Sequence, residues 1–221
     1  MKKSILLSVS VLNADFMRLA ESLKSIDPYA DSFHVDIMDG TITPLISFGT
    51  WVIPSLKKII QTPLEIHLYV RNPTEILEEV LEMGVERVLV DQRTLTYLIE
   101  NSMIHCKERM GLYVLSTDSL DTHGMSIFEH VSLVNVVTVC SLQGGQTISW
   151  DLIEKTKRLD KLREENGFQF DISVDGGINH DVLDRVLSFP IDQVIIGSAI
   201  FTSGNPAENA MKLREFIRSS R

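Results

Sequence analysis

The sequence predicts a (β/α)8 TIM barrel, a closed parallel sheet surrounded by helices, formed by residues 1–221 as a single domain. Three observations support this fold. Short β-rich runs alternate with longer segments of helical periodicity, and eight such runs can be counted. The chain length and the 44% hydrophobic content are sufficient for one large core. No linker, low-complexity tract or charge block indicates a second domain.

The eight predicted strands are short and mostly apolar, as buried parallel strands are. They cover residues 5–11, 32–37, 64–69, 87–90, 111–115, 133–139, 170–174 and 193–196. Helical patterns cover residues 15–26, 74–83, 149–166, 180–187 and 207–219. Residues 91–107 and 119–130 give weaker helical signals, so the boundaries of those two units are the least defined. A doubly wound open sheet is the alternative, but no GxGxxG motif follows the first strand.

Charge and composition exclude several functional classes. The net charge of −9 disfavours a nucleic-acid surface and a membrane surface, because both are recognised by clustered Lys and Arg. An anionic ligand would therefore need local backbone N–H donors. The two cysteines, Cys106 and Cys140, form no disulfide framework or CxxC motif, which favours a reducing cytoplasm. No apolar run reaches transmembrane length.

The second predicted strand carries a chemically distinctive face. Alternation places Phe33 and Val35 on one side and His34, Asp36 and Met38 on the other. An imidazole and a carboxylate two residues apart can bind one divalent metal ion. In a barrel, functional groups gather at the carboxyl ends of the strands, so this strand predicts a site there.

Two further strand ends complete a candidate metal site, with His67 on the third strand and Asp175 on the seventh. Together with His34 and Asp36 they form a set of two imidazoles and two carboxylates, which suits Zn, Mn, Fe or Co. Taken singly, each histidine could be a hydrogen-bonded core residue, and Asp175 could simply open a turn. Four potential ligands at three strand ends favour the metal.

Asp36 and Asp175 come from opposite sides of the predicted barrel, so they can flank a substrate. Two carboxylates on opposite faces of a carbon beside a metal-bound carbonyl can remove a proton from one face and return it to the other. This arrangement predicts epimerisation. Glycines after strands six to eight can bring backbone N–H groups close to a phosphate, although each alone could be an ordinary turn. These residues are Gly144, Gly145, Gly176, Gly177 and Gly197, followed by Ser198.

The motifs resemble those of the ribulose-phosphate 3-epimerase family almost from end to end. The matching segments are residues 10–16, 34–40, 65–68, 144–146, 174–177 and 197–198. The resemblance implies interconversion of ribulose 5-phosphate and xylulose 5-phosphate, with one divalent metal and no organic cofactor. It implies that His34, Asp36, His67 and Asp175 bind the metal and that Asp36 and Asp175 form the acid/base pair. Ser10 and Met38, with His67, would contact the sugar. A homo-oligomer is also implied.

Several residues depart from the pattern of that family without removing any member of the metal set. Val9, Leu45, Tyr69, Val137 and Asp91 replace the usual residues, and segments 116–118 and 140–143 lack the usual prolines. The substrate could therefore be another ketose phosphate, such as a ketohexose 6-phosphate, or the barrel could bind a sugar phosphate without turnover. Decarboxylation or aldol chemistry is a further alternative, but no lysine accompanies the aspartate on strands two or three.

Overall fold

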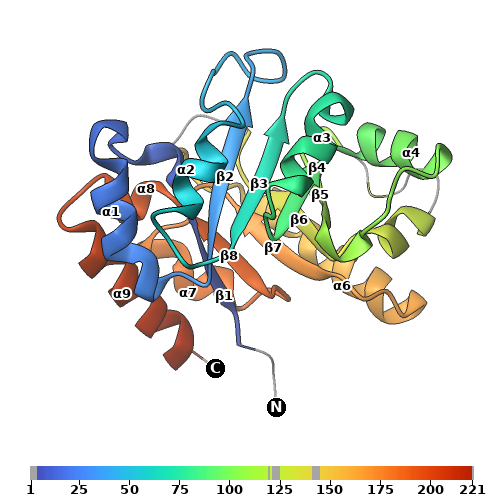
Figure 1. Ribbon diagram of the computed structural model, residues 1–221. Helices are drawn as coiled ribbons and strands as arrows, with labels where there is room; N and C mark the ends of the chain where they lie inside the picture. Colours follow the sequence, from blue (N-terminus) through green and yellow to red (C-terminus); the bar gives the residue numbers. More distant parts are fainter. Residues whose placement is uncertain (1–3, 119, 121–124, 141–144, 221) are drawn as a thin grey trace.

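The computed structural model describes residues 4–118, 120, 125–140 and 145–220. Eight parallel strands follow one another in sequence order around a closed barrel, and β8 pairs with β1 to complete it. Helices surround the strands, and both termini lie at the amino-terminal end of the barrel (Figure 1). The predicted fold class, a (β/α)8 TIM barrel, is confirmed.

The strands agree closely with the β-rich runs of the sequence. They are β1 Leu6–Ser10, β2 Ser32–Met38, β3 Leu64–Tyr69, β4 Arg87–Val90, β5 Met110–Val114, β6 Leu133–Val137, β7 Asp171–Asp175 and β8 Gln193–Ile196. All eight pair in parallel with their neighbours, so their carboxyl ends meet at one face of the barrel. This is the upper face in Figure 1.

The helices vary more in length than the strands do. They are α1 Leu19–Ile26, α2 Val52–Lys57, α3 Pro73–Glu82, α4 Gln92–Glu100, α5 Trp150–Ile153, α6 Lys155–Asn166, α7 His180–Leu187, α8 Ser198–Phe201 and α9 Pro206–Ser219. Short 3-10 turns occupy Val11–Asn13, Phe16–Arg18, Asp27–Tyr29, Lys107–Arg109 and Met125–His130. No helix in the described part of the chain is long and apolar enough to cross a membrane.

The two segments with weak helical signals have different structures. Helix α4 lies within the segment 91–107, and Asp91 caps it by accepting a hydrogen bond of 2.6 Å from the backbone N–H of Thr94. The segment 119–130 contains, among its described residues, the 3-10 turn Met125–His130. Helix α2 has only six residues, which is too short to give a clear helical period in the sequence.

The outward and inward faces of the strands have different surroundings. The outward face packs against the helices, and the inward face lines the interior of the barrel. Outward side chains such as Phe33, Val35 and Ile66 pack against the helices and form the main apolar core. Inward side chains near the amino-terminal end are polar, and Glu65 is central among them. It is paired with Arg87 at 2.6 Å and accepts a hydrogen bond of the same length from Gln193. These polar side chains occupy the amino-terminal half of the barrel interior. The site residues occupy the carboxyl-terminal half.

Candidate metal centre

The predicted metal-site residues are positioned by strands β2, β3 and β7. Alternation on β2 turns His34 and Asp36 inward, and the register of the sheet pairs Asp36 with His67 on β3. Asp175 is the last residue of β7, across the barrel interior. All residues of β2 are buried, so these polar groups must satisfy one another or a ligand.

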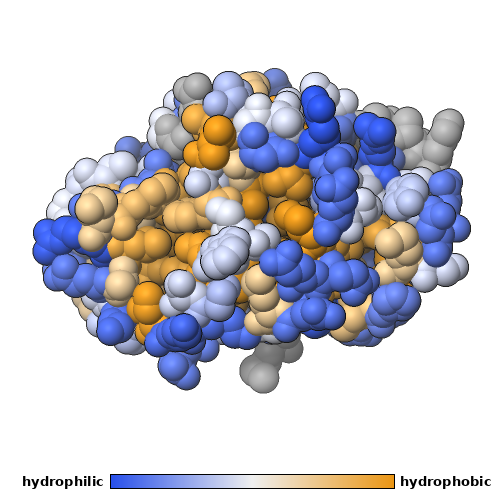
Figure 2. Space-filling model, turned by 45° about the horizontal axis from the view of Figure 1, so that its top comes forward, coloured by the Kyte–Doolittle hydropathy of each residue, from blue (hydrophilic) through white to orange (hydrophobic). Residues whose placement is uncertain are grey.

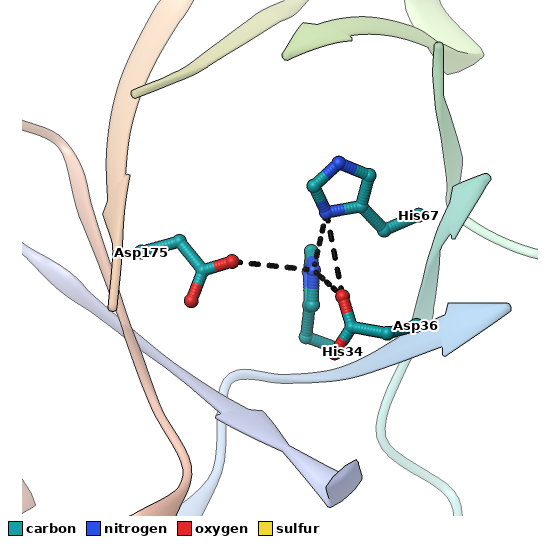
Figure 3. A group of neighbouring side chains, drawn as sticks. All are labelled: His34, Asp36, His67 and Asp175. Carbon is teal, nitrogen blue, oxygen red and sulfur yellow. Dashed lines mark hydrogen bonds and ion pairs between the residues drawn. The ribbon is translucent and has the colours of Figure 1, made fainter. Parts of the chain in front are cut away.

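The four side chains converge on one point (Figure 3). His34 Nε2 lies 3.1 Å from His67 Nδ1, 3.3 Å from Asp36 Oδ1 and 3.9 Å from Asp175 Oδ2. His67 Nδ1 lies 3.4 Å from the same oxygen of Asp36. One ligand atom from each of the four residues can be chosen so that all lie within 4.8 Å of one another. The structure therefore brings the four predicted ligands together.

Burial and mutual charge shift the pKa values within this cluster. Burial lowers the pKa of His34, but the nearby carboxylates, Asp36 foremost, together outweigh burial and raise the pKa to about 9. Burial also lowers the pKa of His67, to about 4. Burial raises the pKa of Asp175 to about 7, whereas the two imidazoles overcome burial at Asp36 and hold its pKa below the usual range. The two carboxyls therefore differ in proton affinity.

This donor set fits a divalent transition-metal ion. Two imidazole nitrogens and two carboxylate oxygens are ligands of Zn, Mn, Fe and Co. The remaining nitrogens, His34 Nδ1 and His67 Nε2, have no hydrogen-bond partner among the described residues. The ring of His67 is instead held by Tyr69, whose ring centroid lies 3.8 Å away, and by Tyr113 at 4.5 Å.

A pocket opens above this cluster at the carboxyl ends of the strands. Asp36 and Asp175 lie on its wall, whereas His34 and His67 are fully buried. The other predicted substrate residues on the wall are Ser10, Met38, Gly145, Gly176, Gly177, Gly197 and Ser198. Gly144 and residues 141–143 of the altered loop lie outside the described residues.

Ser10 links the pocket wall to the metal cluster. Its hydroxyl donates a hydrogen bond of 3.2 Å to Asp36 Oδ2, leaving Asp36 Oδ1 directed toward the two imidazoles. The partner of Ser10 in the sheet register is His34, so strands β1 and β2 hold this contact at fixed spacing. A serine in this position can orient the carboxylate on which the cluster depends.

The pocket also contains residues to which the sequence analysis gave no role. Asn13, in the 3-10 turn after β1, and Gln146, after β6, add amide groups to the wall, and Ile195 adds an apolar side chain. Asn13 and Gln146 lie within the matching segments 10–16 and 144–146, but many amides just after a strand face solvent. Only the closed barrel shows which of them face inward.

The glycines after β7 are required by close backbone packing. Gly177 has a φ of +73°, and a Cβ there would lie 2.3 Å from the backbone nitrogen of Ile148. Gly176 also has positive φ, and a Cβ there would lie 2.8 Å from Val139. The pair therefore lets the loops after β6 and β7 meet beside Asp175.

Three of the departures from the family pattern lie at or next to the pocket. Tyr69 and Val137 line the pocket, and Leu45 packs against the apolar cluster that includes Met38 and Tyr69. Val9 instead faces outward into the main core. These substitutions alter the pocket wall and leave the four converging ligand groups in place.

The fold and the site together define a TIM barrel with a buried two-histidine, two-aspartate centre at the carboxyl ends of its strands. The model of the family "Ribulose-phosphate 3 epimerase family" matches residues 6–201. The chain belongs to this family. A ribulose-phosphate 3-epimerase of Treponema pallidum is 31% identical over 91% of this chain and 94% of its own length. One from Synechocystis is 28% identical over 99% and 96%.

Solved structures of other proteins share the fold at lower identity. The 3-hexulose-6-phosphate synthase of Salmonella typhimurium superposes with a TM-score of 0.73 at 19% identity, covering 98% of this chain and 100% of its own. Orotidine 5'-monophosphate decarboxylase from Methanocaldococcus jannaschii gives a TM-score of 0.68 at 16% identity, with coverage of 97% and 99%. These similarities bear on the fold alone.

Proposed function

We propose that this protein is a metal-dependent epimerase that inverts C3 of a ketose phosphate, with ribulose 5-phosphate and xylulose 5-phosphate as its substrate pair. The observation that carries the proposal is the convergence of Asp36 and Asp175, from β2 and β7, on a cluster that can hold a metal. Both carboxylates also line the pocket. Membership of the family supports the same activity.

The metal would be held by His34, Asp36, His67 and Asp175. When bound, such an ion supplies a positive charge that polarises the substrate carbonyl and stabilises negative charge developing on its oxygen. The mixed nitrogen and oxygen donors favour Zn, Mn, Fe or Co over Ca. We propose no organic cofactor, because proton transfer beside a carbonyl requires only a base, an acid and charge stabilisation.

The two carboxylates would move the proton. One removes the proton from C3, and the other returns a proton to the opposite face of the same carbon, which inverts its configuration. In the metal-free protein the pKa of Asp36 is held below its usual range and that of Asp175 is raised to about 7, so the two carboxyls differ in proton affinity before a metal is bound. Each carboxylate can act as the base on its own side of the carbon, with the other as the acid. In the reverse direction the roles exchange.

The phosphate would lie beside the glycine loops that follow β6, β7 and β8. Gly145, Gly176, Gly177, Gly197 and Ser198 face the pocket, and glycine lets backbone N–H groups approach an anion closely. Gly144, which lies outside the described residues, was predicted from the sequence for the same role. Ser10 and Met38, on the pocket wall, would contact the sugar. His67 was expected to contact it too, but this residue is fully buried and absent from the wall, so we propose it only as a metal ligand.

A second candidate is the same reaction on a different ketose phosphate, such as a ketohexose 6-phosphate. The observation in its favour is that Tyr69 and Val137 both line the pocket where family members usually carry methionine. Retained sugar-phosphate binding without turnover is the remaining alternative, and it would require that the four converging ligand groups serve no reaction.

Turnover assays separate these candidates. The protein, loaded in turn with Zn, Mn, Fe or Co, is incubated with ribulose 5-phosphate and with ketohexose 6-phosphates, and C3 epimers are separated and quantified. Turnover of ribulose 5-phosphate supports the first proposal, and turnover of a ketohexose 6-phosphate alone supports the second. Inactivity on every substrate with every metal would reject both epimerase proposals.

We also propose that the chain acts as a single-domain homo-oligomer in the cytoplasm, without nucleic-acid or membrane partners. In support of a single domain, helix α9 contacts both α1 and β1 and so joins the last helix to the first strand.

Exposed apolar side chains support the oligomer. Met17, Ile46 and Trp51 are 93%, 81% and 87% exposed. Hydrophobic residues also gather on the face of the molecule that Figure 2 shows. A monomeric mass by light scattering at micromolar concentration would contradict the oligomer.

A further inference from the structure

Two buried tyrosine hydroxyls lie next to the metal cluster without hydrogen-bond partners among the described residues. Tyr69 and Tyr113 are each 1% exposed, and neither Oη atom is paired. A buried polar group left unpaired is unfavourable, so it commonly marks a place where a ligand completes the bonding. Which of the two tyrosines could contact a ligand depends on which one borders the pocket.

Only Tyr69 of this pair reaches the pocket wall. It lines the pocket together with Asp36, Met38 and Asp175, whereas Tyr113 is not part of that wall. The carboxylates of Asp118 and Asp91 are the charged groups that act on Tyr113, whereas those of Asp175 and Asp36 act on Tyr69. Tyr69 is therefore the one of the two tyrosines that borders the pocket.

Packing fixes the ring of Tyr69 and leaves its hydroxyl unpaired. The ring lies against His67, with centroids 3.8 Å apart, and against Tyr113 at 4.9 Å. Met38 and Leu89 belong to the same apolar cluster. A phenol held in this way loses little conformational freedom when it donates a hydrogen bond, which favours binding.

The position of Tyr69 indicates which end of a ligand it would contact. Tyr69 is the last residue of β3, and β3 lies four strands from β7 in a closed barrel of eight, which places the two strands on opposite walls. Gly176 and Gly177 follow β7. A sugar phosphate with its phosphate beside these glycines would extend its other end toward Tyr69.

We propose that the phenolic O–H of Tyr69 donates a hydrogen bond to the C1 hydroxyl oxygen of the bound ketose 5-phosphate, which makes Tyr69 a specificity-determining residue. The orientation of the ligand rests on the proposed function and its phosphate site. This hydrogen bond would select substrates that carry an oxygen at the end remote from the phosphate. A ligand without that oxygen would leave the phenol buried and unpaired.

The test uses two ligands that cannot be epimerised because they lack a carbonyl. Binding of xylitol 5-phosphate and 1-deoxyxylitol 5-phosphate is measured by calorimetry on the Zn-loaded protein and on its Tyr69→Phe and Tyr113→Phe variants. We expect the unaltered protein to prefer xylitol 5-phosphate by about fivefold, the value of one neutral hydrogen bond. Tyr69→Phe should remove this preference, and Tyr113→Phe should retain it.

A spectroscopic measurement checks the contact without relying on affinity. The chain has four tyrosines, so ring-carbon labelling at Cζ gives a small set of NMR signals, which Tyr69→Phe assigns. Xylitol 5-phosphate should shift the Tyr69 signal, while inorganic phosphate and 1-deoxyxylitol 5-phosphate should leave it nearly unchanged. An unshifted Tyr69 signal with xylitol 5-phosphate bound would overturn the proposal.

The outcomes separate this proposal from the proposed function. An equal preference in Tyr69→Phe and in the unaltered protein overturns the role of Tyr69, even if C3 of ribulose 5-phosphate is epimerised. Loss of the preference in Tyr69→Phe supports that role, even if no substrate is turned over. Failure of the unaltered protein to bind either ligand overturns it as well.

Discussion

At the scale of single residues, the site depends most on Asp36. Its Oδ1 lies near both imidazoles, and its Oδ2 accepts a hydrogen bond from Ser10. Its negative charge is also what raises the pKa of His34 against the effect of burial. Two predictions follow from these contacts, one for the protons of the cluster and one for Ser10.

Metal binding should release protons in a pH-dependent way. A metal needs a neutral imidazole and ionised carboxylates, while His34 has a pKa of about 9 and Asp175 a pKa of about 7 in the metal-free protein. At pH 8, His34 is mostly protonated and Asp175 mostly ionised, so about one proton should leave per metal bound. At pH 6, both groups are mostly protonated, so release should approach about two.

Zinc titration calorimetry in pairs of buffers with different ionisation enthalpies measures this release directly. The number of protons should increase as the pH is lowered from 8 to 6, because the additional proton comes from Asp175. Proton release that stays at zero across this range would show that the four groups do not bind the metal in the proposed way.

Ser10→Ala should weaken metal binding by about tenfold, because groups that orient a ligand carboxylate typically contribute that much or more. The control is Ser8→Ala, on the same strand and facing the same interior. Ser8 donates to Glu65 at 3.2 Å and has no hydrogen bond to Asp36. Equal metal affinities of the two variants, measured by competition with a chelating dye, would argue against a role for Ser10.

At the scale of elements, the loops after β6 and β7 determine where Asp175 lies. The hydroxyl of Thr138 lies 2.9 Å from the backbone oxygen of Asp175 and 2.6 Å from that of Gly176, so its single proton is shared between these two acceptors. Gly177 lets the backbone of Ile148 approach closely. The end of β7 is therefore held by its neighbouring loop as well as by the sheet.

Gly177→Ala should be more destabilising than Gly167→Ala, although both glycines have nearly the same positive φ, +73° and +72°. A Cβ at Gly167 meets nothing within 4 Å, so its cost is about 1 kcal/mol of backbone strain. At Gly177 the clash with Ile148 adds to that strain. Denaturant unfolding compares the two, and equal free energies of unfolding would contradict the close packing.

At the scale of the whole molecule, polar residues inside the amino-terminal half of the barrel connect distant strands. Glu65 accepts hydrogen bonds from Ser8, Ser32 and Gln193 and pairs with Arg87 at 2.6 Å. These partners come from β1, β2, β8 and β4. The network joins both sides of the closure between β1 and β8.

Glu65→Leu should lower the free energy of unfolding by about 3 kcal/mol, since it leaves Arg87 without its buried partner. The control is Glu154→Gln, which breaks an ion pair with Lys157 whose side chains are 52% and 57% exposed. That change should be too small to measure, because solvent screens the pair. Equal unfolding midpoints for both variants in urea would contradict the importance of the network.

The strands and the convergence of the metal-site residues could be predicted from the sequence because both follow from local alternation and from the meeting of parallel strand ends. Asp36 and His67 share a register position that the inward faces of β2 and β3 already implied. Helix α2 and the 3-10 turn Met125–His130 are too short or irregular to produce a period.

The residues of the pocket wall were harder to predict from the sequence. Asn13 and Gln146 lie in loops, where no alternation tells which way a side chain points. That the Tyr69 hydroxyl has no hydrogen-bond partner among the described residues depends on three-dimensional packing with His67 and Tyr113. Such properties arise from contacts between separate strands.

The most direct test of the central claim is solvent deuterium exchange at C3 of ribulose 5-phosphate, with protein loaded with Zn, Mn, Fe or Co. The two-carboxylate account predicts deuterium at C3 together with epimerisation, and loss of epimerisation in both Asp36→Asn and Asp175→Asn. No exchange with any metal, or full epimerisation in either variant, would contradict the account.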